Sequence, residues 1–169
     1  MKDDAVRIAV LTISDSRDEE SDTSGGWLAR AVEQSGHRLA GKRIVPDSVD
    51  SIRQAVTAWA GAGDIDVVIT TGGTGLTGRD VTPEAVRPLF DKEIDGFAAV
   101  WHAISYQSIG LSTLQSRACA GIVGTTFVFC LPGSNGAVRD GWTKVIAPQL
   151  ERSTRPCNFV EIMPRLAER

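Results

Sequence analysis

Three runs of apolar and β-branched residues alternate with segments of helical periodicity in the first half of the chain. The runs cover Val6–Ile13, about Arg38–Val45 and Asp66–Thr71, and their apolar stretches are typical of buried strands. Strands that alternate with helices are joined by right-handed βαβ crossovers. The order therefore predicts an α/β fold, in which a largely parallel sheet is covered by helices on both sides. The clearest helical face lies between the second and third runs and consists of Ile52, Ala55, Val56 and Trp59.

The second half of the chain mixes helix and hairpin signals. Thr82-Pro83-Glu84 is typical of a helix start, with Thr82 as the N-cap and Pro83 at the first helical position. The apolar runs Ala118–Val123 and Phe127–Leu131 flank a turn and predict a β-hairpin. The tail from Ser153 is expected to be irregular. Two more helices are predicted from the apolar faces Phe97, Val100, Trp101 and Ile104, and Val138, Trp142, Val145 and Ile146.

Composition limits the classes of protein that the chain can belong to. A length of 169 residues without a linker predicts one domain over residues 1–169. The formal net charge of −3 argues against a nucleic-acid partner, which would normally require a basic surplus. No stretch approaches the ~20 apolar residues of a membrane span, and Met1–Asp4 lacks the apolar core of a signal peptide. The three cysteines lack metal or redox spacing, so a cytoplasmic protein without a soft-metal site is expected.

A glycine-rich segment, Gly72–Asp80, directly follows the third predicted strand. Ligands of open parallel sheets bind outside the carboxyl ends of the strands. Closely spaced glycines let backbone N–H groups approach an anion, so this loop is predicted to bind phosphate. Three other loops are expected at the same edge: Ser14-Asp15-Ser16, Pro46-Asp47-Ser48 and Pro132-Gly133-Ser134-Asn135.

The glycine loop differs from two common phosphate-binding motifs. Gly73-Thr74-Gly75-Leu76-Thr77-Gly78 contains the letters of the dinucleotide fingerprint, Gly-x-Gly-x-x-Gly. That fingerprint needs its third glycine inside a helix and an acidic residue about twenty positions later at a strand end. Here the helix is expected only at Thr82, and no Walker lysine follows the glycines. A dinucleotide-dependent oxidoreductase therefore stays the least favoured alternative.

Two carboxylates, Asp47 and Asp80, are expected on neighbouring strand ends beside the glycine loop. Mg²⁺ prefers one or two carboxylates together with phosphate oxygens and water. The pair therefore predicts a Mg²⁺–nucleotide site. In the alternative interpretation, Asp47 caps the helix at Ser48 and Asp80 only orders the turn before Thr82.

Thr70–Gly75 followed by Arg79–Ala85 resembles the signature of the molybdenum cofactor biosynthesis proteins of the MoaB/Mog family. The resemblance covers about residues 5–160. Thr113–Arg117 and the tail Thr154–Phe159 are more similar to the MoaB branch than to the Mog branch. Shorter matches lie at Ser14-Asp15-Ser16, Asp22-Thr23-Ser24-Gly25, Ser116-Arg117 and Leu131-Pro132-Gly133.

The resemblance implies a three-layer α/β/α sandwich that binds molybdopterin. Active members are adenylyltransferases, which use Mg²⁺ and ATP to form adenylyl-molybdopterin and release pyrophosphate. Asp47 and Asp80 match the carboxylates that serve catalysis and Mg²⁺ binding. Some MoaB-branch proteins lack the carboxylate at the position of Asp47, and because this chain has both, an active enzyme is favoured over a non-catalytic molybdopterin carrier. The remaining substrate-binding and nucleotide-binding positions are Ser14, Thr71, Gly72, Gly73, Thr74, Gly75, Ser116, Arg117, Pro132, Gly133 and Ser134.

The resemblance also implies partners. Family members assemble as trimers, and MoaB-branch proteins often as hexamers built from two trimers. Only small-molecule substrates are expected as ligands, with no nucleic acid and no membrane. Handover of the product to a molybdenum-inserting protein would complete the implied pathway step.

Overall fold

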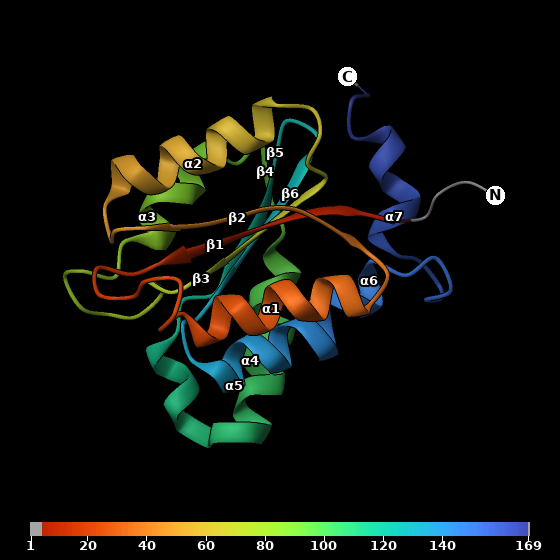
Figure 1. Ribbon diagram of the computed structural model, residues 1–169. Helices are drawn as coiled ribbons and strands as arrows, with labels where there is room; N and C mark the ends of the chain where they lie inside the picture. Colours follow the sequence, from red (N-terminus) through yellow and green to blue (C-terminus); the bar gives the residue numbers. More distant parts are fainter. Residues whose placement is uncertain (1–4, 169) are drawn as a thin grey trace.

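The computed structural model describes residues 5–168, and its centre is one six-stranded sheet (Figure 1). The strands run in the spatial order β2-β1-β3-β6-β5-β4. The first four of these are mutually parallel, whereas β5 and β4 are antiparallel to their neighbours. The expected α/β fold with a mostly parallel sheet is thus confirmed. The bounds are β1 Arg7–Ile13, β2 Arg38–Val45, β3 Val67–Thr71, β4 Lys92–Glu93, β5 Cys119–Val123 and β6 Thr126–Leu131.

Helices cover both faces of the sheet, which confirms the three-layer α/β/α arrangement (Figure 1). Two helices, α2 (Val49–Gly61) and α3 (Thr82–Val86), pack on one face. The other face is covered by α1 (Thr23–Gln34), α4 (Asp95–Ile109) and the C-terminal helices. Those helices are α5 Asn135–Asp140, which continues through a π-helical segment Gly141–Ile146 into α6 Ala147–Gln149, and α7 Phe159–Ile162.

The interior strand β1 is apolar at successive positions because both of its faces are buried. Ile8 and Val10 face the core under α1, whereas Leu11 and Ile13 face the core under α2. All four side chains are buried. A strand with both faces covered has no solvent-facing position, so the alternation that identifies half-exposed strands is lost.

The second half agrees with the predicted hairpin but departs from the sequence expectations in two smaller elements. The strands β5 and β6 pair antiparallel around Gly124, as expected. The strand β4 was not predicted because two residues are too few to show a pattern. The tail was expected to be irregular, but it contains α7, where Val160 is buried and Phe159 stacks on Phe127 at 4.9 Å between ring centroids.

The predicted N-cap of α3 is wrong. Val81 occupies that position, without a side-chain capping bond, and Thr82 is the first helical residue. The Thr82 hydroxyl instead donates to the carbonyl oxygen of Gly72 at 2.8 Å. The Thr82 side chain therefore connects α3 to the glycine loop.

Three further expectations concern residues away from the site. Cys119 and Cys130 are buried free thiols, and Cys157 is an exposed one. Between residues 5 and 168, no helix is both long and apolar enough to cross a bilayer. The expectation for Met1–Asp4 falls outside the described residues.

Candidate active site

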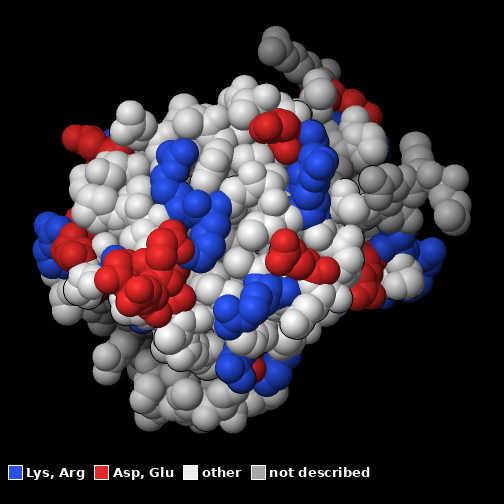
Figure 2. Space-filling view, viewed as in Figure 1, with Lys and Arg blue, Asp and Glu red and all other residues white. Residues whose placement is uncertain are grey.

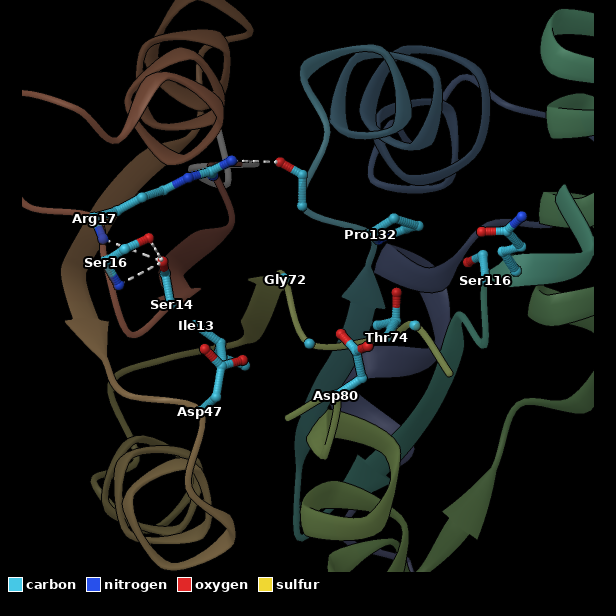
Figure 3. Close-up of a pocket in the computed structure, with 14 residues that line it drawn as sticks. Ile13, Ser14, Ser16, Arg17, Asp47, Gly72, Thr74, Asp80, Ser116 and Pro132 are labelled. Carbon is cyan, nitrogen blue, oxygen red and sulfur yellow. Dashed lines mark hydrogen bonds between the residues drawn. The ribbon is translucent and has the colours of Figure 1, made fainter. Parts of the chain in front are cut away.

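A cavity of about 410 Å³ opens at the carboxyl ends of the parallel strands (Figure 3). It brings together loops that follow β1, β2, β3 and β6 with the segment before β5. All predicted site residues line it except Thr71, Arg117 and Ser134. The lining residues are Ile13, Ser14, Ser16, Arg17, Asp47, Gly72, Gly73, Thr74, Gly75, Asp80, Gln115, Ser116, Pro132 and Gly133.

One side of the cavity is formed by residues 72–80, which we call the glycine-loop wall. Gly72 has φ +108°, and a Cβ atom there would lie 2.2 Å from the carbonyl oxygen of Ile13. Gly73 has φ +68°, and its Cβ would lie 2.3 Å from the Thr82 hydroxyl oxygen. Only glycine combines a positive φ with such close approach at no steric cost. Both positions therefore require glycine. The Gly72 N–H donates to the carbonyl oxygen of Leu131 at 3.0 Å, whereas the Gly73 N–H donates to none of residues 5–168.

Arg117 fixes the glycine-loop wall from behind. Its Nε donates to the carbonyl oxygen of Gly75 and its Nη2 to that of Asp80, each at 2.8 Å. Its backbone N–H donates to Thr74, also at 2.8 Å, and its guanidinium pairs with Glu84. A planar guanidinium can hold several acceptors in one geometry, which a lysine could not do. Arg117 thus supports the loop and does not face the cavity.

Asp80 lines the cavity and also orders its own turn. Its Oδ2 accepts from the backbone N–H of Thr77 at 2.9 Å and from the Thr77 hydroxyl at 2.6 Å. These hydrogen bonds lower the pKa of Asp80, so the group is a carboxylate at neutral pH. The turn-ordering role considered as an alternative is therefore present, together with exposure of the carboxylate to the cavity.

The opposite side consists of Ser14–Arg17 and Asp47, which we call the β1–β2 wall. The backbone N–H of Asp15 donates to Asp47 Oδ2 at 2.9 Å, and the backbone N–H of Asp47 donates to Asp15 Oδ1 at 3.0 Å. Burial, and next the nearby charge of Asp15, raise the pKa of Asp47. The helix-capping alternative for Asp47 fails because Ser48 caps α2, accepting from Ser51 N–H at 3.4 Å.

The two carboxylates are not on neighbouring strands, contrary to the sequence expectation. They follow β2 and β3, and β1 lies between these strands. They nevertheless flank the same loop: a Cβ on Gly73 would lie 3.3 Å from Asp47 Oδ1, and one on Gly75 would lie 2.6 Å from Asp80 Oδ2. Figure 3 shows the two side chains on either side of the loop that starts at Gly72. The loops, rather than strand adjacency, bring the carboxylates together.

Sequence reasoning missed Arg17, the one cationic side chain among the cavity-lining residues that the structure describes. Its Nη1 donates to the Ser24 hydroxyl at 2.7 Å and its Nη2 to the carbonyl oxygen of Gly133 at 3.2 Å. The available signal was its place directly after Ser14-Asp15-Ser16 at a strand end. Arg17 was overlooked because it begins a highly charged loop.

A second missed contact joins the two walls at the rim. Arg79 forms a two-pronged ion pair with Asp15, donating from Nε to Oδ2 and from Nη2 to Oδ1, each at 2.9 Å. The Arg79 side chain is 68% exposed and that of Asp15 43%. Contacts this exposed are weak in water.

Three other predicted residues have defined structural positions. The Thr71 hydroxyl donates to the carbonyl oxygen of Pro132 at 3.1 Å, behind the cavity surface. The Ser134 hydroxyl caps α5 by accepting from Ala137 N–H at 3.2 Å. By contrast, the buried Ser116 hydroxyl has no hydrogen-bond partner within residues 5–168 and lines the cavity. A buried hydroxyl without a partner is costly, so Ser116 is available to a ligand.

The residue types at the site suit a hard cation that shares its coordination with a ligand. The described residues contain no group of three or more His, Cys, Asp and Glu side chains that could hold a metal. Asp47 and Asp80 are two oxygen donors in one cavity, which meets the usual protein contribution to a Mg²⁺–phosphate site. The arrangement can therefore bind Mg²⁺ with a phosphorylated ligand.

The surface around these loops carries charges of both signs. Figure 2 shows acidic side chains clustered on the left of this face, where the loops after the strands lie, with basic side chains beside them. Ion pairs formed by residues of these loops and of β2 include Lys42 with Glu19 at 2.6 Å and Arg79 with Asp15 at 2.7 Å.

The chain matches known proteins over most of its length. Residues 9–152 match the family described as a probable molybdopterin binding domain. Molybdenum cofactor biosynthesis protein B of Escherichia coli (strain K12) is 50% identical over 153 residues, 90% of each chain. A crystal structure of a molybdenum cofactor biosynthesis protein B has a TM-score of 0.89 at 43% identity, with 100% of both chains covered. A MogA structure has a TM-score of 0.72 at 30% identity, covering 86% of this chain and 100% of that one.

Proposed function

The chain belongs to the MoaB/Mog family of molybdenum cofactor biosynthesis proteins, and from this premise we propose that it is a molybdopterin adenylyltransferase. Its substrates would be Mg²⁺–ATP and molybdopterin, and its products adenylyl-molybdopterin and pyrophosphate. The greater similarity to protein B than to MogA agrees with the resemblance of Thr113–Arg117 and the tail to the MoaB branch.

The observation that carries the proposal is the pair of carboxylates on either side of the glycine loop. Asp47 and Asp80 would hold Mg²⁺, which when bound would neutralise phosphate charge and polarise the reacting phosphorus. The low pKa of Asp80 keeps this ligand ionised at neutral pH. The raised pKa of Asp47 reflects burial next to Asp15, a cost that a bound cation would offset.

The remaining residues would position the phosphates. The N–H of Gly73, which donates to none of the residues that the structure describes, would contact a phosphate oxygen, and Arg117 holds the following loop residues through the carbonyl oxygens of Thr74, Gly75 and Asp80. An oxygen of the molybdopterin phosphate would form a bond to the α-phosphorus of ATP, and the bond to the β-phosphate oxygen would break. Because the nucleophile is already an anion, no general base is needed. Positioning and charge stabilisation would supply most of the rate.

A non-catalytic molybdopterin carrier is the second candidate. The observation in its favour is that Asp80 Oδ2 already accepts two hydrogen bonds from Thr77. If Oδ2 stays engaged, Asp80 serves the loop more than a cation. The two candidates differ in one product, because only the enzyme releases pyrophosphate.

Pyrophosphate release from Mg²⁺–ATP in the presence of molybdopterin tests the proposal. We expect release by the wild-type protein, no release by Asp80→Ala, and severely reduced release by Asp47→Ala. Asp50→Ala, which removes an exposed carboxylate in the first turn of α2, is the matched control and should keep full activity. A wild-type protein that binds molybdopterin tightly yet releases no pyrophosphate would establish the carrier instead.

We also propose that the protein works in the cytoplasm as a trimer or a hexamer and delivers its product to a molybdenum-inserting protein. An exposed apolar surface at the end of α4 and in the following 3₁₀ segment is suited to contact between copies. Its members are Tyr106 and Ile109, each 56% exposed, and Leu111 and Leu114, each 71% exposed. Sedimentation should give a trimer or hexamer that Leu111→Glu/Leu114→Glu dissociates, whereas a wild-type monomer would contradict the assembly.

A further inference from the structure

We propose that Arg17 and Ser14 form a phosphate-oxyanion subsite in the cavity, with the Arg17 guanidinium at the end away from Asp47 and Asp80. The inference rests on the proposed function, because it divides the same cavity into a cation end and an anion end. Figure 3 shows the Arg17 guanidinium on the far side of the cavity from both carboxylates.

Arg17 is held in place but is not saturated. A guanidinium has five N–H donors, and the contacts of Arg17 with the Ser24 hydroxyl and Gly133 carbonyl use one donor each. The buried carboxylate of Asp22 lies 3.9 Å from Nη1 and keeps the cation at this position. The other three N–H groups donate to none of the residues that the structure describes, and Arg17 lines the cavity.

The hydroxyl of Ser14 is restricted to donating. Its oxygen accepts from Ser16 N–H at 3.2 Å and from Arg17 N–H at 3.1 Å. A serine hydroxyl has two lone pairs and one proton, so both acceptor positions are filled and the proton remains. Ser14 Oγ also lies 3.5 Å from Ser16 Oγ, a long contact in which either hydroxyl could donate. A ligand that meets Ser14 must therefore offer an acceptor.

The charges of the lining side chains favour a phosphate group at the Arg17 end of the cavity. Two of the lining side chains, Asp47 and Asp80, are acidic, and Arg17 is the lining cation within residues 5–168. A phosphate group without metal is repelled by the carboxylates and attracted by Arg17. Guanidinium–phosphate hydrogen bonds are charge-assisted and stronger than neutral ones.

The other two arginines near the cavity are committed elsewhere. Arg117 donates to two loop carbonyls and to Glu84. Arg79 is paired with both oxygens of Asp15 at the exposed rim. Neither residue lines the cavity. Arg17 is thus the guanidinium with free donors at the site.

Titration calorimetry without Mg²⁺ isolates the anion end. Inorganic phosphate and pyrophosphate are the probes, and Arg17→Gln is the main variant. We expect the variant to bind both anions about 10- to 100-fold more weakly, the usual range for a hydrogen bond to a charged group. Arg30→Gln removes an exposed arginine of α1 with the same change in charge and should bind as the wild type does. Asp47→Asn should bind the anions a few-fold more tightly, because it removes a repelling charge.

Two further measurements make the result decisive. Arg17→Lys keeps the charge but loses the planar fork, so it should recover only part of the affinity. Phenyl phosphate and Mg²⁺-free ATP separate the possible sources of the oxyanion. If Arg17→Gln binds phenyl phosphate more weakly than the wild type does, the subsite is assigned to a phosphomonoester. If the variant loses affinity for ATP alone, the subsite is assigned to the nucleotide. Each assignment supports the subsite.

Three outcomes would overturn the subsite. They are no binding of any probe by the wild type, equal binding by Arg17→Gln, and an equal loss in Arg30→Gln. Thermal unfolding of Arg17→Gln within a few degrees of the wild type shows that the variant is folded. Pyrophosphate release is measured separately, so anion binding that depends on Arg17 in a protein without turnover would retain the subsite and reject only the adenylyltransferase.

Discussion

The two walls of the cavity are built in different ways. The glycine-loop wall is held by Thr82 and by the guanidinium of Arg117, whose contacts lie behind the cavity surface. The β1–β2 wall is held by reciprocal hydrogen bonds between Asp15 and Asp47 and by turn contacts of Ser14. Most polar groups of the first wall bond within that wall, and Asp80 and the N–H of Gly73 are what it offers to the cavity. The second wall offers Asp47, Ser14 and Arg17, so the first wall contributes mainly shape and the second mainly recognition.

The difference predicts two kinds of mutational effect. Substitutions in the glycine-loop wall should change the stability of the fold, because they disturb packed backbone. Substitutions in the β1–β2 wall should change ligand binding with little change in stability. Asp80 is the exception, since it belongs to the glycine-loop wall and also faces the cavity.

Gly72→Ala should have the largest effect. The new Cβ would lie 2.2 Å from a backbone oxygen of β1 at φ +108°, so the strand end or the loop must shift. We expect a loss of about 4 kcal/mol or more in the free energy of unfolding, as for other backbone clashes in a core. Urea denaturation measures it.

Gly78→Ala is the matched control in the same loop. A Cβ there would have no atom within 4 Å, and no positive φ is required. The change should leave the free energy of unfolding within about 1 kcal/mol, with stabilisation as the favoured direction. A similar loss in both variants would mean that the glycine-loop wall is not a fixed structure.

The two carboxylates should respond to pH in opposite directions. The lowered pKa of Asp80 means that its ionised form stabilises the fold above the unfolded pKa, and that this is lost as pH falls through the lowered value. The raised pKa of Asp47 means that its contribution is present at low pH and is lost as pH rises through the raised value. At pH 7, ionised Asp80 is therefore favourable and ionised Asp47 is unfavourable.

Replacing each carboxylate by the matching amide tests whether its ionised form stabilises or destabilises the fold. At pH 7, Asp80→Asn should lower the free energy of unfolding and Asp47→Asn should raise it, each by less than about 1 kcal/mol because both groups are partly solvated. Both differences should shrink as the pH approaches 3. A destabilised Asp47→Asn at pH 7 would show that the β1–β2 wall is built for stability as well.

Arg79→Gln should have the smallest effect. Its ion pair with Asp15 joins the two walls, but both side chains are exposed. We expect a loss below about 1 kcal/mol in the free energy of unfolding, decreasing in 1 M salt. If urea denaturation showed a loss above about 2 kcal/mol in the free energy of unfolding, the stability of the two walls would be coupled through this ion pair.

The sequence predicted the sheet better than the way the site is assembled. Buried β-branched runs and helical periodicity identified the strands and main helices, because both follow from local burial. Nothing local showed that β1 separates the strands that precede Asp47 and Asp80. Strand order is set by long-range packing, which periodicity does not encode.

Individual residues of the site also show that the sequence predicts local features better than contacts between distant segments. The resemblance to the MoaB/Mog family pointed to Ser14 and Ser116, and both line the cavity. It also pointed to Arg117, whose supporting role depends on a contact across 42 positions with Gly75. Arg17 was missed because a cation in a charged loop has the same sequence pattern whether it faces solvent or a cavity.

The most direct test of the central claim is pyrophosphate release from Mg²⁺–ATP with molybdopterin, measured on the wild type, Asp47→Asn and Asp80→Asn. The account predicts release by the wild type and a loss of about 100-fold or more in Asp80→Asn, in the range of other charge-stabilising groups. Asp47→Asn should be strongly impaired although it folds at least as stably. Full activity in both variants, or no release by a wild type that binds both substrates, would contradict the assignment of these carboxylates.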